Sequence, residues 1–225
     1  MKHVRNIHII GTSHIAKDSV KKVKESFDIL KPDILALELD PGRAYSLENN
    51  IKRPKNLILL KNLGLMGFLF FLFGEFLQKN LGKIVNIKPG AEMLTALKTA
   101  RNKNIAIALI DRDIRITLRR FSKYFRKREL LKIIMDMIFG AFKKNSLGDV
   151  DLSKVPADNI IEIVLEQTKK RYPSLYKVLI EERDIYMARN LIHISENNPD
   201  KKIMAVVGAG HLNGMLNYMH KENFI

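Results

Sequence analysis

Two histidines stand in the same short sequence context near opposite ends of the chain. The first context is Gly-Thr-Ser-His at residues 11–14, and the second is Gly-Ala-Gly-His at residues 208–211. Each follows an apolar run that is typical of a buried strand, and each has a glycine where we expect the backbone to bend sharply. Taken singly, such a histidine is usually a structural residue or a helix cap. The carboxyl ends of parallel strands are the usual ligand position, so the repeated context predicts that His14 and His211 share one site. There a neutral imidazole could bind a divalent metal or act as a base.

Glu38 follows another apolar run, residues 34–37, and Asp40 and Arg43 come within one turn of it. A buried glutamate needs a partner or a metal ion. Glu38 is therefore a candidate metal ligand or general base, and Arg43 is a candidate for polarising a carbonyl or holding a carboxylate. The structural alternative is an internal salt bridge between Glu38 and Arg43.

Asp111 and Arg112 end a third apolar run, residues 105–110. Asp111 lies where a site residue is expected, although capping a helix that begins near Ile114 is the commoner use of such an aspartate. Arg112 is a candidate for binding an anionic substrate group or for pairing with Glu38.

Two other charged groups have ordinary structural interpretations. Glu92 opens a predicted helix, where a carboxylate is favourable to the helix dipole. Residues 182–184, Glu-Arg-Asp, lie in the middle of a predicted helix, where a charge cluster is typically solvated.

The composition of the chain limits the metal ligands and the binding partners that it can have. The chain has 225 residues, no cysteine and a net charge of +15, so any metal site must rest on histidine, aspartate and glutamate. Such a charge suggests nucleic acid, an anionic membrane surface or an acidic substrate as partner, or a bias toward solubility or thermal adaptation. No nucleic-acid-binding signature supports the first, and the glycines around residue 208 lack the pattern of a nucleotide loop. The basic segment 112–132 is more typical of a solvated or membrane-facing helix.

Four short apolar blocks, residues 7–10, 34–37, 105–110 and 203–207, have the pattern of strands covered on both faces. Helical patterns at 16–30, 89–102 and 212–220 lie beside them. We therefore expect an α/β fold with a mainly parallel or mixed central sheet flanked by helices. We treat residues 1–225 as a single domain with helical insertions at about 50–88 and 114–197.

The most apolar stretch is residues 57–77, and its uncharged part, 62–74, is shorter than the ~20 residues that cross a bilayer. We interpret it as a core helix, a subunit interface or an interfacial membrane helix. The apolar face at 68–76 favours a homodimer. The start of the chain has no signal-peptide pattern and runs straight into a strand, so we expect a cytoplasmic protein, with peripheral contact to a membrane as the alternative.

Six sequence blocks together resemble the TraB/PrgY family, which is linked to pheromone shutdown and related to the TIKI proteases. The blocks are His-Ile-Ile-Gly-Thr-Ser-His (8–14), Leu-Ala-Leu-Glu-Leu-Asp-x-x-Arg (35–43), Pro-Gly-Ala-Glu-Met (89–93), Leu-Ile-Asp-Arg-Asp-Ile-x-x-Thr-Leu-x-Arg (109–120), Glu-Arg-Asp-x-x-Met-Ala (182–188) and Val-Val-Gly-Ala-Gly-His-x-x-Gly (206–214). The resemblance covers nearly the whole chain. It implies an architecture like that of the erythromycin esterases and TIKI proteases, with His14, His211 and Glu38 gathered in one pocket and Arg43 and Arg112 nearby. Further pocket candidates within the blocks are Gly11, Asp40, Glu92, Asp111, Arg183 and Gly208.

From the residues and the resemblance we expect a metal-dependent hydrolase that cleaves or inactivates a peptide at an amide or ester bond. The metal, Mn, Co or Zn, would bind through His14, His211 and Glu38, and Arg43 or Arg112 would stabilise the developing oxyanion. The alternative is a non-catalytic protein that sequesters a peptide or small ligand in the same cleft and docks on a membrane through its basic and apolar helices.

Overall fold

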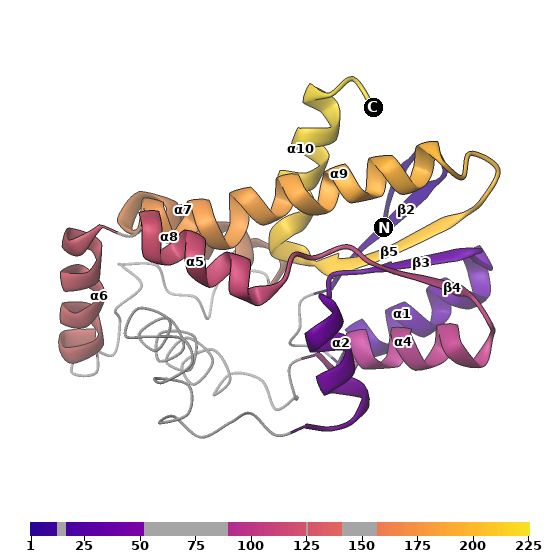
Figure 1. Ribbon diagram of the computed structural model, residues 1–225, viewed down its shortest axis with the longest axis horizontal. Coiled ribbons are helices and arrows are strands. Elements are labelled where there is room, and N and C mark those ends of the chain that lie inside the picture. The colour runs from indigo at the N-terminus through magenta and orange to yellow at the C-terminus, as the bar shows by residue number, and fades with distance from the viewer. Residues whose placement is uncertain (13–16, 52–89, 125, 141–156) are drawn as a thin grey trace. The chain divides into compact units, whose positions relative to one another are not determined.

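The computed structural model of the protein describes residues 1–12, 17–51, 90–124, 126–140 and 157–225 (Figure 1). His14 and the apolar stretch 57–77 lie outside the described residues. The shared-histidine pocket and the homodimer face therefore stay predictions.

The chain divides into two compact units. Unit 1 is drawn from Met1–Arg53, Ile84–Ile114 and Glu182–Ile225, and the described residues of unit 2 lie within Arg115–Glu181. Unit 2 thus covers most of the helical insertion predicted at 114–197. The assignment of the whole chain to a single domain stays a prediction.

A five-stranded mixed sheet organises unit 1. Its strands lie in the spatial order β1 (Lys2–Val4), β2 (Ile7–Thr12), β5 (Ile203–Gly208), β3 (Ile34–Leu37) and β4 (Ala106–Leu109). β1 and β2 are antiparallel, and the other neighbouring strands are parallel. This order confirms the predicted α/β fold. β1 was not predicted as a separate strand; it turns back onto β2 through Arg5, which has a φ of 51°.

Helices cover the two faces of this sheet (Figure 1). One face packs against α9 (Glu182–Glu196) and α10 (Ala209–Lys221), and the other packs against α1 (Lys17–Leu30) and α4 (Ala91–Asn102). Alternate residues of a strand point to opposite faces, so Ala205 and Val207 join the first core while Met204 and Val206 join the second. Every residue of β5 is buried, which explains its unbroken apolar sequence.

Unit 2 is helical where it is described. It contains α5 (Ile114–Tyr124, apart from its first residue), α6 (Lys127–Gly140), α7 (Ala157–Arg171), α8 (Pro173–Tyr176) and the π-helix η2 (Lys177–Glu181). Its small core consists of Phe121, Ile133, Leu175 and Val178. No helix of the described residues is both long and apolar enough to cross a membrane.

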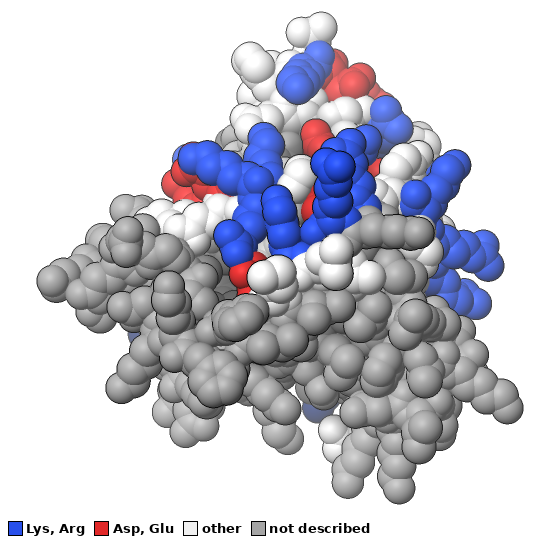
Figure 2. All heavy atoms as spheres, turned by 90° about the vertical axis from the view of Figure 1, so that its left-hand side faces the viewer, with Lys and Arg blue, Asp and Glu red and all other residues white. Residues whose placement is uncertain are grey.

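Unit 2 also carries many exposed basic side chains, which we call its basic surface. Figure 2 shows lysines and arginines gathered on one face of the described residues. The tyrosine Tyr124 lies among them, with Arg120, Lys123 and Lys177 5.0, 5.7 and 5.4 Å from its ring centroid. The exposed members of the basic surface are Arg115, Arg119, Lys123, Arg126, Arg128, Lys132, Lys169, Lys170, Arg171 and Lys177.

Candidate functional site

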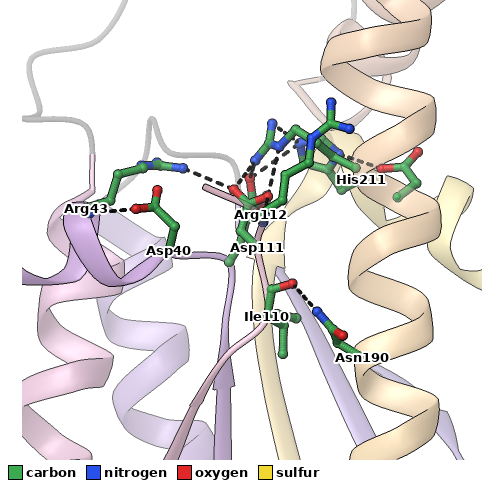
Figure 3. Close-up of polar contacts among 11 residues, drawn as sticks. Asp40, Arg43, Ile110, Asp111, Arg112, Asn190 and His211 are labelled. Atoms are coloured by element: carbon green, nitrogen blue, oxygen red, sulfur yellow. Dashed lines mark hydrogen bonds and ion pairs between the residues drawn. The ribbon is translucent and has the colours of Figure 1, made fainter. Parts of the chain in front are cut away.

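Arg183 lies at the centre of a buried polar cluster at the carboxyl ends of the parallel strands. Figure 3 shows Asp111 and His211, two members of this cluster, close together. Its Nη2 donates to Glu38 Oε1 at 2.6 Å and to Asp111 Oδ2 at 2.8 Å, and its Nε donates to Asp111 Oδ1 at 3.1 Å. The side chains of Arg183, Glu38 and Asp111 are only 16%, 5% and 3% exposed. Burial disfavours the charged guanidinium, but the carboxylates outweigh burial and raise the pKa of Arg183 above its ordinary value. Arg183 is therefore a permanent cation.

His211 lies in the first turn of α10, and both of its ring nitrogens have polar neighbours. Nδ1 is 2.5 Å from Asp184 Oδ1, and Nε2 is 3.1 Å from Arg183 Nη1 and 3.3 Å from Glu38 Oε1. A guanidinium can only donate, so Nε2 must accept from Arg183. The ring proton then lies on Nδ1 and is donated to Asp184. This tautomer leaves the basic lone pair of His211 on Nε2, facing Arg183 and Glu38.

Asp184 and Gly214 complete the setting of His211, and sequence reasoning left both out of the site. Burial raises the pKa of Asp184, although its hydrogen bond to His211 acts in the opposite direction. A Cβ atom at Gly214 would lie 1.9 Å from Asp184 Oδ2, so only glycine lets α10 approach this carboxylate. The sequence did contain a signal for Gly214. The spacing His-x-x-Gly puts His211 and Gly214 on one face of a helix.

The first glycines of the two Gly-x-x-His contexts, Gly11 and Gly208, let neighbouring groups come close to the backbone. Gly208 donates its N–H to Glu38 Oε2 at 2.5 Å and has an extended backbone, with φ of −62° and ψ of 138°. Gly11 lies within β2, where a Cβ would be 3.3 Å from Leu212 Cδ2 and 3.5 Å from Ala209 Cα. The expectation of a sharp bend is therefore wrong for Gly11, which lies inside β2, whereas at Gly208 the chain passes from β5 into α10. Both glycines let a carboxylate or the start of α10 come close to the backbone.

Arg43 lies at the exposed edge of the cluster. Its Nη1 is 3.4 Å from Asp111 Oδ2, and its side chain is 47% exposed. The alternative of a Glu38–Arg43 salt bridge is therefore wrong. Arg43 pairs with Asp111, and Glu38 pairs with Arg183. Asp111 also accepts from the backbone N–H of Arg112 at 2.8 Å.

Arg112 and Asp40 have structural partners of their own. Arg112 Nη1 donates to Glu182 Oε2 at 3.0 Å, and both side chains are nearly buried. Asp40 caps α2 (Pro41–Glu48) by accepting from the N–H groups of Gly42 and Arg43 through Oδ1. Its buried Oδ2 has no hydrogen-bond partner among the described residues.

The remaining charged candidates are also buried. Residues 182–184 form the first turn of α9, where Asp184 is 4% exposed. The expectation that this cluster is solvated is therefore wrong, whereas the expected place within a longer helical stretch is confirmed, because α9 follows η2 directly. Glu92 is buried in the first turn of α4, the position that suits a carboxylate at a helix N-terminus.

The described donors do not fit a divalent metal as they stand. The two atoms best suited to bind one, His211 Nε2 and Glu38 Oε1, both face the Arg183 guanidinium. An ion bonded at the usual ~2.0–2.2 Å would overlap this group and share its charge sign. No set of three or more histidine or acidic residues in the described ranges is arranged to hold a metal ion. Because His14 is outside those ranges, the predicted metal stays a prediction.

Comparison with known proteins gives whole-chain similarity to one family. The family described as TraB/PrgY/gumN matches residues 2–225. An uncharacterised protein of Methanocaldococcus jannaschii is 34% identical over 233 residues, which cover 98% of this chain and 57% of the relative. TraB domain-containing proteins of Bos taurus and Homo sapiens are 24% and 23% identical over 237 residues, which cover 93% of this chain and 61% of theirs. The chain thus spans less than two thirds of the length of these relatives.

Proposed function

The chain belongs to the TraB/PrgY/gumN family, and from the arrangement of its own residues we propose that it hydrolyses amide or ester bonds with His211 as general base. One observation carries the proposal. Asp184 holds Nδ1 of a buried histidine, and this pairing leaves an unprotonated Nε2 at the ligand-binding end of a parallel sheet. A peptide or a small amide or ester is the substrate class that this chemistry serves.

In the proposed reaction, Nη1 of Arg183 moves off Nε2 of His211 while its Nη2 and Nε stay bonded to Glu38 and Asp111. Nε2 then removes a proton from a water molecule as the water oxygen attacks the substrate carbonyl carbon. The ring then carries a positive charge, which the carboxylates of Asp184 and Glu38 favour and the nearby guanidinium of Arg183 opposes. The proton on Nε2 is transferred to the leaving nitrogen or oxygen as the carbonyl–heteroatom bond breaks. Water supplies the hydroxyl group of the acid product, so the atoms balance.

Arg43 is the group best suited to meet the substrate. Its half-exposed side chain and its long 3.4 Å contact with Asp111 leave it able to turn toward a substrate oxygen. There its charge would stabilise the developing oxyanion. Asp40 Oδ2, buried without a partner among the described residues, could accept a hydrogen bond from a substrate N–H or O–H group.

Replacing His211 by asparagine tests the proposal. We expect hydrolysis of chromogenic esters and a peptide set, each assayed with chelator and with Mn²⁺, Co²⁺ or Zn²⁺, to fall about 100- to 10,000-fold. His220→Asn is the matched control, because His220 is exposed on the same helix. An His211→Asn protein with the wild-type rate would end the proposal.

A second candidate function is sequestration of a peptide or small ligand without catalysis. It is favoured by the way in which the charges of the cluster already neutralise one another, with Arg183 shared between Glu38 and Asp111. Peptide binding by a wild-type protein that turns over none of these substrates, under any of the three metals, would favour the binder.

A further inference from the structure

We infer that the guanidinium of Arg183 is a resident cation in a set of metal-type donors, so that Arg183 and a divalent ion compete for one place. The inference concerns cation binding alone and does not depend on hydrolysis. It also accounts for the misfit between the described donors and the predicted metal.

The geometry around Arg183 gives the first argument. Its Nη2 lies 2.6 Å from Glu38 Oε1 and 2.8 Å from Asp111 Oδ2, while its Nη1 lies 3.1 Å from His211 Nε2. Two carboxylate oxygens and an imidazole nitrogen are the ligands that Zn²⁺ and similar ions take from proteins. Here all three converge on the end of one guanidinium. With that group removed, modest side-chain shifts would bring the same atoms to metal-binding distance.

The charges give the second argument. Glu38 and Asp111 are almost wholly buried, at 5% and 3% side-chain exposure, and two buried carboxylates are costly without a cation. Arg183 supplies that cation from α9, whereas the described side-chain contact of Arg43 is a longer one, 3.4 Å, to Asp111. Loss of the Arg183 charge would leave a buried, net negative pocket that a divalent ion can neutralise.

Gly208 and Asp184 hold Glu38 and His211 in place independently of Arg183. The N–H of Gly208 fixes the far oxygen of Glu38 at 2.5 Å, and Asp184 fixes the far nitrogen of His211 at 2.5 Å. The near atoms of Glu38 and His211 are thus still directed toward the same place when the guanidinium is absent. Such supporting contacts are what orient ligands in metal sites.

Thermal unfolding of Arg183→Gln with and without Mn²⁺, Co²⁺ or Zn²⁺ tests the inference. We expect the ions to leave the Tm of the wild type unchanged and to raise the Tm of Arg183→Gln by about 5 °C or more at about 100 times Kd. Arg183→Lys keeps a positive charge and should respond like the wild type. Arg189→Gln, which removes an exposed charge from the same helix, should do the same. Adding His211→Asn to Arg183→Gln should abolish the response.

Several results would overturn the inference. These are an equal metal response in the wild type, no response in Arg183→Gln, or a response that survives the added His211→Asn change. If Arg183→Gln does not fold alone, it is refolded with and without the ions. Recovery of folded protein only with an ion supports competition, and failure of every ion to restore folding contradicts it.

Discussion

Asp184 has surroundings that conflict with the usual negative charge of its carboxylate. Burial raises its pKa above the ordinary value of 3.8, yet it holds the Nδ1 proton of His211 and lies against the Cα of Gly214. The orientation of the histidine therefore depends on a carboxylate that the fold keeps in an unfavourable place.

The stability of the protein should depend on pH through Asp184. Because its folded pKa lies above its unfolded value, the folded protein holds this proton more tightly. Stability from this group is present at low pH and is lost as pH rises from the ordinary value through the raised one, by up to about 1.4 kcal/mol per pH unit. Urea unfolding from about pH 4 to about pH 7 should show wild type losing stability relative to Asp184→Asn. A difference between the two proteins that stays constant or grows with pH would contradict this.

Replacing Gly214 by alanine should destabilise the protein. Helix propensity alone predicts that Gly214→Ala stabilises α10 by about 1 kcal/mol. The 1.9 Å approach of Asp184 Oδ2 predicts the opposite, a loss of roughly 1–3 kcal/mol, since the carboxylate must move. Chemical denaturation measures the sign, with Asn217→Ala, exposed on the same helix, as control. A stabilised Gly214→Ala protein would show that the carboxylate moves freely.

At the scale of elements, the site is a meeting of strand ends with the first turns of two helices. β3 leads to Glu38 and β4 to Asp111, while α9 presents Arg183 and α10 presents His211. α9 is tied to the end of β4 by Asn190, whose Nδ2 donates to the carbonyl of Ile110 at 2.9 Å (Figure 3). This bond holds the middle of α9 close to the end of β4.

Removing this tie should have a measurable cost. Asn190→Ala leaves the buried carbonyl of Ile110 without that donor, so we expect a loss of about 1–3 kcal/mol in the free energy of unfolding. Asn197→Ala at the exposed end of α9 should change it by less than about 0.5 kcal/mol. Equal effects of the two substitutions in urea titrations would show that the Asn190 bond contributes nothing specific.

At the scale of the whole molecule, the sequence predicts what depends on local pattern and misses what depends on distant contacts. The parallel strands were predictable because fully buried strands read as unbroken apolar blocks, whereas β1 is short and mostly polar. Glu38, Asp111 and His211 were predictable because they follow strands. The role of Asp184 depends on the packing of α9 against α10, which no local pattern in Glu-Arg-Asp displays.

The basic surface of unit 2 gives a prediction at the same scale. With a net charge of +15, the protein should bind vesicles that contain anionic lipid and not neutral ones, and about 0.5 M salt should release it by screening. Flotation assays at low and high salt measure this. Binding to neutral vesicles that persists in high salt would instead indicate an apolar contact.

The position of the ring proton of His211 decides whether Nε2 can act as the general base. In protein labelled with ¹⁵N-histidine, with the signals assigned by His211→Asn, the account predicts a proton on Nδ1 and an unprotonated Nε2 near neutral pH. A neutral His211 that carries its proton on Nε2 would contradict it, because that nitrogen would have no lone pair to accept from Arg183 or, once Arg183 moves away, to take a proton from water.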